Sequence, residues 1–247
     1  MASQVWAALL ALAIPLSTFG QTERASENTI PFVGCKSDGQ IGPVEAPMGT
    51  GKAVDVSASD ARQLAYYKSD VLDFGVVGPV GWDCFAVYGS GGSALFVVPE
   101  RVDSEHILAA VQHGFEGVIE VEVNDGDTSG RYTVAEVIGL VFPAYRKDAK
   151  GTMADIDQTL PAGPYPADQL SRKSKRVVEY VTPAGKEGLG THSRLGKSHM
   201  PIHGVAILFG EPLSLVQLSV RLPKDQEGLA AAIISQVERD LSALGDK

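Results

Sequence analysis

Apolar residues alternate with polar ones or gather in short runs along most of the chain, and this pattern predicts many strands. Two runs, 84–88 and 94–98, flank the glycine-rich residues 89–93, which is typical of a β-hairpin. Residues 118–123 alternate with period two, which predicts a strand half buried on one face. Further strands are expected at 30–35, 53–56, 176–181, 202–209 and 213–222. The short connection between the last two predicts a second antiparallel hairpin.

Helical spacing of apolar residues predicts four helices. The first begins with an S-x-x-D capping pattern at Ser57 and Asp60. The last carries one continuous apolar stripe, which needs a partner and should therefore cover a sheet face. The expected ranges are 57–68, 103–114, 132–142 and 225–244.

Mixed strands and helices with short connections predict an α+β fold. We expect an antiparallel sheet, built from the hairpin 84–98 and the C-terminal strands at 176–222, packed with helices that include the C-terminal one. Residues 150–172 contain three prolines and no clear periodicity, so they are the expected internal boundary. The expected parts are an N-terminal α+β part, 21–150, and a C-terminal part, 173–247, or one continuous domain.

The N-terminus predicts export. Residues 5–16 are an apolar run too short for a bilayer, which needs about 20 residues. Small residues follow at Thr18 and Gly20, so residues 1–20 are interpreted as a signal peptide. No Lys or Arg precedes the run, and a buried helix is the alternative. A periplasmic or extracellular protein is expected, with no membrane span after cleavage.

Export changes the interpretation of the two cysteines. In an oxidising compartment Cys35 and Cys84 should form a disulfide bond. Two free buried thiols are the alternative. The formal net charge of −9 argues against nucleic acid or an anionic membrane surface as the main partner.

The sharpest local motif lies at residues 125–136, which resemble a calcium loop of the EF-hand type. Gly130 supplies the sharp turn, whereas a solvated turn that caps a helix is the alternative interpretation. A serine at the fifth position, a tyrosine at the eighth and a preceding strand depart from the pattern. The expected Ca²⁺ ligands are Asp125, Asp127, Ser129, Arg131 (through its backbone carbonyl) and Glu136.

Two other candidate sites are weaker. His192, His199 and His203 gather near one loop, where imidazoles can ligate zinc or copper, but surface histidines are the favoured interpretation. Ser90 does not match the G-x-S-x-G nucleophile elbow, because Tyr88 stands where the first glycine is required.

Three segments carry a family resemblance: GWDCFAVYGSGG, LFVVP and VAILFGEPLSLVQLSVRLP. They resemble an uncharacterised family of exported bacterial proteins over most of the chain that follows the signal peptide. The resemblance implies export and a bacterial source, and it implies no activity, cofactor or catalytic residue.

The sequence therefore favours a non-catalytic binding or structural module of the cell envelope. Its partner is expected to be a small molecule or an envelope protein. The alternative is a secreted hydrolase with a site near residues 188–203, stabilised by calcium. A cleft that brings His192 or His203 within hydrogen-bond reach of a serine and a carboxylate would favour the hydrolase.

Overall fold

A computed structural model describes residues 28–103, 105–111 and 114–245. The expected signal peptide, 1–20, lies outside the described residues. Among those residues, no helix has the length and apolar character needed to cross a membrane.

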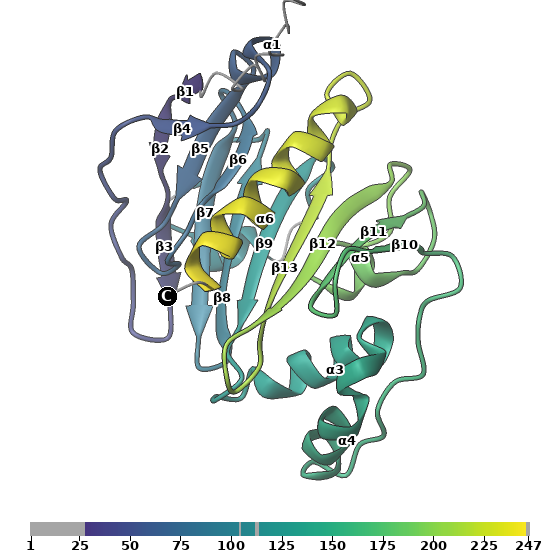
Figure 1. Cartoon of the computed structure of the whole chain (residues 1–247). Coiled ribbons are helices and arrows are strands. Elements are labelled where there is room, and N and C mark those ends of the chain that lie inside the picture. Colours follow the sequence, from purple (N-terminus) through teal and green to yellow (C-terminus); the bar gives the residue numbers. More distant parts are fainter. Residues whose placement is uncertain (1–27, 104, 112–113, 246–247) are drawn as a thin grey trace, which may run out of the picture.

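An eight-stranded sheet forms the centre of the fold (Figure 1). It is antiparallel throughout, except that β3 pairs with β7 in parallel. β9 joins the two hairpins, because it pairs with β8 on one side and with β13 on the other. From edge to edge the strands are β10 (Gln169–Arg172), β11 (Val177–Thr182), β12 (Ile202–Phe209), β13 (Ser214–Arg221), β9 (Val118–Asn124), β8 (Gly92–Val98), β7 (Asp83–Gly89) and β3 (Lys36–Gly39).

Two small sheets and one long helix cover the first face of this sheet (Figure 1). The helix is α6 (Ala230–Gly245), which contacts β6, β12 and β13 and follows a 3₁₀ turn, η2 (Glu227–Leu229). In the three-stranded sheet, β2 pairs in parallel with β5, and β5 pairs antiparallel with β6. The small-sheet strands are β2 (Phe32–Gly34), β5 (Leu64–Lys68) and β6 (Val76–Pro79), with β1 (Asn28–Ile30) and β4 (Lys52–Val54) as an antiparallel pair.

Helices and loops cover the second face. α3 contacts β9 and β13, and the single-turn α5 contacts β11 and β12. Apolar residues of β9 alternate between two cores: Ile119 and Val121 belong to the first face, and Val118 belongs to the second. The large sheet is therefore the middle of three layers. The remaining helices are α2 (Ile107–Ala110), α3 (Arg131–Val141), η1 (Pro143–Tyr145), α4 (Arg146–Ala154) and α5 (Leu189–His192).

The α+β class, both hairpins and the C-terminal helix are confirmed. The helix expected at 57–68 is wrong beyond its first turn: α1 (Ala58–Ala61) is capped by Ser57, but Leu64–Lys68 forms β5. Its residues Tyr66 and Tyr67 extend the apolar pair Leu64 and Ala65 into a buried run of the kind that strands favour.

Three other expectations need adjustment. The helix expected at 103–114 is described only as the single turn α2, and residues 104 and 112–113 lie outside the description. The expected boundary 150–172 contains the end of α4 and the unpredicted edge strand β10. The large sheet combines strands from both expected parts, 21–150 and 173–247.

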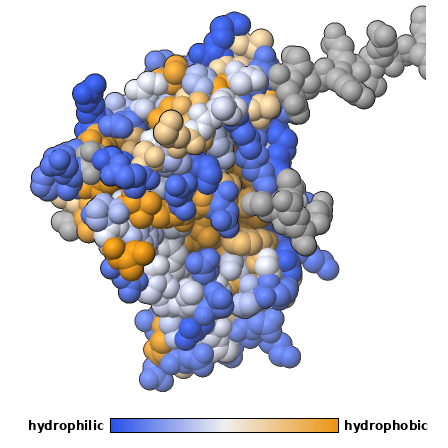
Figure 2. All heavy atoms as spheres, turned by 90° about the vertical axis from the view of Figure 1, so that its left-hand side faces the viewer, coloured by the Kyte–Doolittle hydropathy of each residue, from blue (hydrophilic) through white to orange (hydrophobic). Residues whose placement is uncertain are grey.

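One side of the molecule shows apolar surface between hydrophilic areas (Figure 2). The loop between β3 and β4 lies on that side (Figure 1), and it exposes Ile41 and Met48 by 88% and 99%. Single exposed apolar side chains are common on protein surfaces, so we assign no role to them.

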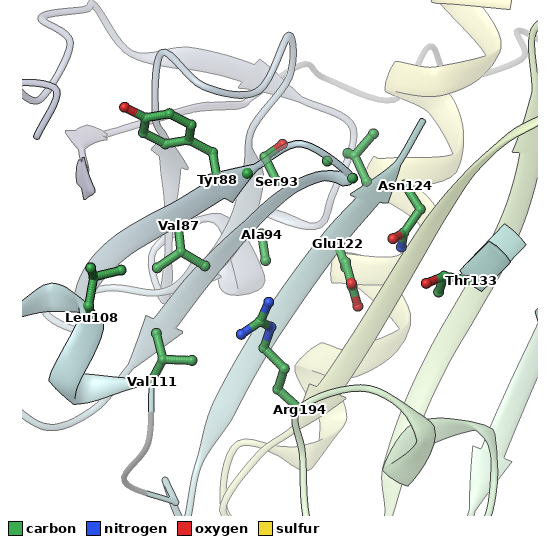
Figure 3. Close-up of a pocket in the computed structure, with 14 residues that line it drawn as sticks. Val87, Tyr88, Ser93, Ala94, Leu108, Val111, Glu122, Asn124, Thr133 and Arg194 are labelled. Carbon is green, nitrogen blue, oxygen red and sulfur yellow. The ribbon is translucent and has the colours of Figure 1, made fainter. Parts of the chain in front are cut away.

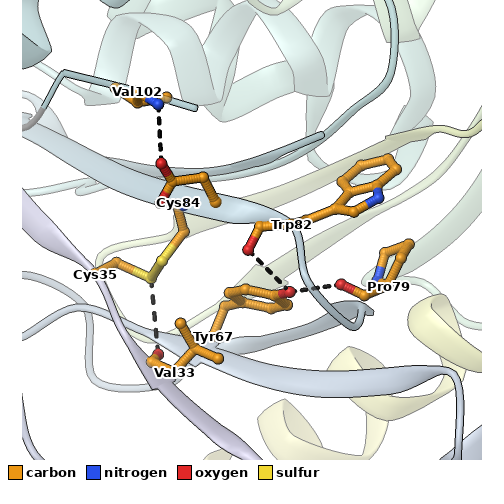
Figure 4. Close-up of a disulfide and its surroundings, with 8 residues drawn as sticks. Val33, Cys35, Tyr67, Pro79, Trp82, Cys84 and Val102 are labelled. Atoms are coloured by element: carbon orange, nitrogen blue, oxygen red, sulfur yellow. Dashed lines mark hydrogen bonds between the residues drawn. A yellow bond between two sulfur atoms is a disulfide. The ribbon is translucent and has the colours of Figure 1, made fainter. Parts of the chain in front are cut away.

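A disulfide bond links the small sheets to the large one (Figure 4). Cys35 lies where the chain passes from β2 to β3, and Cys84 lies in β7. Beside the bond, the buried hydroxyl of Tyr67 donates to the backbone carbonyl oxygens of Pro79 and Trp82. The predicted disulfide is thus confirmed, and it fixes the start of the first hairpin.

Removal of the disulfide is expected to destabilise the fold without changing it. The double variant Cys35→Ala/Cys84→Ala frees a loop of 49 residues, which should lower the free energy of unfolding by about 4 kcal/mol in the chain-entropy model. Urea unfolding of the oxidised protein and the variant measures this loss, with reduced wild-type protein as control. Equal stability of the oxidised protein and the variant would contradict it.

Candidate functional site

β9 places two glutamates on the second face of the large sheet, the face that α3 and α5 cover. Glu120 pairs with Phe96 of β8 and with Ser219 of β13. Glu122, two residues on, pairs with Ala94 and Gln217. Since alternate residues of a strand share a face, both carboxyl groups point into the same layer.

Neighbouring polar groups in this layer are hydrogen-bonded. The hydroxyl of Tyr180, in β11, donates to the carbonyl oxygen of Leu218 over 2.9 Å and lies 2.7 Å from the hydroxyl of Ser219. The amide nitrogen of Gln217 donates to the carbonyl oxygen of Leu189 over 3.0 Å, which ties α5 to the sheet.

Glu120 is the exception. Its side chain is 1% exposed, and among the described residues neither carboxyl oxygen has a hydrogen-bond partner of normal geometry. Burial is the main cause that raises its pKa to about 8, and the nearby Glu122 raises it further. Ser193 and Arg194 lie close enough to lower the pKa in part. Glu120 therefore keeps its proton at neutral pH.

The segment that covers Glu120 is held at both ends. At the start of α5, the carboxylate of Asp168 accepts hydrogen bonds from the backbone N–H of Leu189 and the hydroxyl of Thr182, each over 2.7 Å. At the other end, the guanidinium of Arg221 donates to the carbonyl oxygen of Gly196 over 2.7 Å. These contacts fix residues 193–194 above the sheet.

A pocket of about 550 Å³ opens beside this cover (Figure 3). Val87, Leu108 and Val111 form its apolar wall. Its rim includes the tip of the first hairpin, where Gly92 has φ +146° and lies so close to β9 that a Cβ would stand 1.9 Å from the carbonyl oxygen of Val123. Only glycine permits this approach. The glycines of the hairpin therefore shape the pocket.

The polar side of the pocket carries one carboxylate and one guanidinium. Glu122 points into it from β9, and Arg194 points into it from the segment after α5 (Figure 3). In the part of the chain that the structure describes, neither side chain forms an ion pair. The amide nitrogen of Asn124, a 6% exposed residue, also has no hydrogen-bond partner there. The two charged groups are free to bind a ligand, whereas the Asn124 nitrogen is buried. Thr133 of α3 adds a hydroxyl group to the lining.

The expected calcium ligands lie around the start of α3. Asp125 is half buried, and burial, with Asp127 and Asp73 as smaller causes, raises its pKa. The hydroxyl of Ser129 contacts that of Ser90 over 3.3 Å. No group of three or more Asp, Glu, His or Cys side chains suited to hold a metal ion occurs within the described residues.

Two further features of the loop bear on the calcium hypothesis. α3 begins at Arg131, so the helix includes Glu136, whose carboxylate lies 3.5 Å from the imidazole of His192. Gly130 lies so close to Gly91 that a Cβ would stand 2.0 Å from its carbonyl oxygen, which accounts for this glycine without calcium. Calcium binding by the loop stays a prediction.

The three histidines of the 188–203 region meet different carboxylates. His199 lies 3.3 Å from Glu116, and His203 lies 3.4 Å from Glu227. His192 faces Glu136 and, over 3.5 Å, the hydroxyl of Tyr165. Within the described residues, none of these imidazoles forms a hydrogen bond with a serine.

Sequence reasoning missed Glu120, Glu122 and Arg194. The alternation at 118–123 predicts a strand with one buried face, which leaves the two glutamates in solvent. One feature of the sequence does indicate that the glutamates are buried. The strand at 118–123 lies between two predicted hairpins, and the chain has enough predicted helices to cover both faces of the resulting sheet. A central strand of such a sheet buries both sets of side chains.

Ionisation of Glu120 is expected to oppose folding as the pH rises. Its pKa is about 8 when folded, against an ordinary value of 4.5. Between these values the folded state keeps a proton that the unfolded state releases, so the free energy of unfolding falls as pH rises through this window. Glu120→Gln removes the effect and should raise stability at pH 7 by on the order of 3 kcal/mol, at about 1.4 kcal/mol per pKa unit.

Urea unfolding at pH 4, 7 and 9 measures the difference between the variant and the wild-type protein. The two proteins should have nearly equal stability at pH 4, where the carboxyl group is largely protonated in both states. Glu100→Gln, at an exposed position, is the control and should follow the wild-type protein at every pH. A constant difference between Glu120→Gln and the wild-type protein would contradict the assignment.

Comparisons of the chain with protein-family models, with curated proteins and with solved structures each found no match. The site is therefore defined by its own geometry: a pocket at the hairpin end of β7, β8 and β9, with opposite charges on its walls and the buried carboxyl group of Glu120 two residues from Glu122 on the same strand.

Proposed function

We propose that this protein is an exported, non-catalytic binding protein that holds a small polar ligand in the pocket between the first hairpin, β9 and Arg194. The observation that carries the proposal is a pair of opposite charges without ion-pair partners among the described residues, Glu122 on β9 and Arg194 on the segment after α5, which both line that pocket. A largely preformed cavity with an apolar wall and a few polar groups is typical of small-molecule sites, and 550 Å³ is within their usual size.

The rigid frame around the pocket supports binding. β7, β8 and β9 are consecutive strands of the large sheet, and both ends of the segment that carries Arg194 are hydrogen-bonded to the fold. Groups held in place before binding lose little conformational entropy when a ligand arrives. The pocket therefore suits recognition of one defined shape.

Export is part of the proposal. The confirmed disulfide between Cys35 and Cys84 supports it, because such bonds persist in oxidising compartments. The apolar run at 5–16 supports it from the sequence. An envelope or extracellular location would give a binding protein access to solutes from outside the cytoplasm.

A second candidate function is hydrolysis near residues 188–203. One observation favours it: Glu120, with its raised pKa, lies beside both Glu122 and Ser193. A buried carboxyl group that keeps its proton next to a second carboxylate is a common arrangement in acid–base catalysts. Glu120 does not line the pocket, however, so a substrate in the pocket would not touch it.

Binding at the pocket is testable by NMR. We expect at least one compound from a panel of citrate, glucose, AMP, L-leucine and the dipeptide Leu-Leu to shift the backbone amide signals of 89–94, 122–124 and 194. Arg194→Ala should weaken that binding at least tenfold, because it removes the only cationic group that lines the pocket in the described part of the chain.

The matched control is Lys197→Ala, an exposed position three residues further along that does not line the pocket. It should leave the affinity unchanged. The proposal is wrong if no compound shifts the pocket signals, or if the shifts lie elsewhere. Turnover of a compound by the wild-type protein, lost in Glu120→Gln, would favour the hydrolase instead.

A further inference from the structure

We propose that the ligand is a zwitterion with an apolar side chain, an α-amino acid or a short peptide, whose carboxylate binds Arg194 and whose ammonium group binds Glu122. This inference depends on the proposed function, since it names the ligand class of the same pocket. It is carried by the placement of two opposite charges on different elements around one cavity (Figure 3).

The two charges face one space without neutralising each other. Arg194 reaches the pocket from the segment after α5, and Glu122 reaches it from β9. No ion pair within 4.0 Å joins them, and neither pairs with another described residue. Each charge therefore has room for a ligand group of the opposite sign.

The net charge of the pocket discriminates between ligand classes. Glu120, two residues before Glu122 on β9, keeps its proton at neutral pH because burial raises its pKa, so it adds no charge. One carboxylate and one guanidinium remain on the walls. A simple anion would pair with Arg194 but would be repelled by Glu122. A simple cation would pair with Glu122 but would be repelled by Arg194. A molecule with both charges satisfies both walls.

The opposite wall fits an apolar side chain. Val87 and Val111 line it, and Leu108 on α2 is 51% exposed at the same pocket. Coverage of Leu108 by an aliphatic group would remove apolar surface from water. The pocket of about 550 Å³ has room for a dipeptide as well as for a single amino acid. Titration with L-leucine and with Leu-Leu distinguishes these two ligand sizes.

Calorimetric titration of the full chain with a matched series tests the assignment. The probes are L-leucine, the dipeptide Leu-Leu, 4-methylpentanoate, which lacks the ammonium group of leucine, and 3-methylbutylamine, which lacks its carboxylate. We expect leucine or Leu-Leu to bind at least tenfold more tightly than either compound with a single charge.

Variants that remove one charge test whether the ligand carboxylate binds Arg194 and whether the ligand ammonium group binds Glu122. Arg194→Gln should weaken zwitterion binding at least tenfold and leave binding of the amine unchanged. Glu122→Gln should weaken zwitterion binding by a similar factor and leave binding of 4-methylpentanoate unchanged or stronger. Lys197→Gln is the matched control and should bind as the wild-type protein does. Thermal unfolding of each variant shows that the fold is retained.

Three outcomes overturn the inference. Equal binding of the zwitterion and a compound with a single charge removes the need for both walls. Binding of citrate, glucose or AMP at the pocket in place of the zwitterions leaves the proposed function intact and overturns only the ligand class. Failure of every compound in both panels overturns the ligand class and the proposed function together.

Discussion

Burial of both faces of the eight-stranded sheet is the constraint on which the rest of the structure depends. β9 lies near the centre of that sheet, so its odd-numbered residues Ile119 and Val121 enter one core and its even-numbered residues enter the other layer. Glu120 is forced into the interior with no hydrogen-bond partner of normal geometry among the described residues, and its pKa rises to about 8. The cost of burying this carboxyl group is concentrated next to the pocket, which is where functional sites often carry unfavourable groups.

The two faces of the large sheet are covered in different ways. On the first, α6 and the small sheets close an apolar core, and the Cys35–Cys84 bond ties the small sheets to the first hairpin. On the second, short elements and loops leave space above β8 and β9, and Arg194 enters that space from a distant part of the chain. A rigid first face and an open space on the second are compatible with the small-molecule binding proposed above.

The sequence predicts correctly those elements whose structure depends mainly on residues close to them along the chain. The hairpin 84–98, the hairpin 202–222 and the C-terminal helix belong to this class. β5 was missed because the apolar pair Leu64 and Ala65 satisfies helical spacing, while the following tyrosines favour a strand. The pocket was missed because residues 193–194 and β9 are far apart in sequence. Only the register of β9 with β13 and the anchors at Asp168 and Arg221 bring them together.

The central claim is that the sheet buries Glu120 as a neutral carboxylic acid beside the pocket. Carbon-13 NMR of the side-chain carboxyl carbon, assigned by comparison with Glu120→Gln, measures its protonation directly as a function of pH. The structure leads us to expect a titration midpoint near 8. A midpoint near 4.5, the ordinary value for glutamate, would contradict the account.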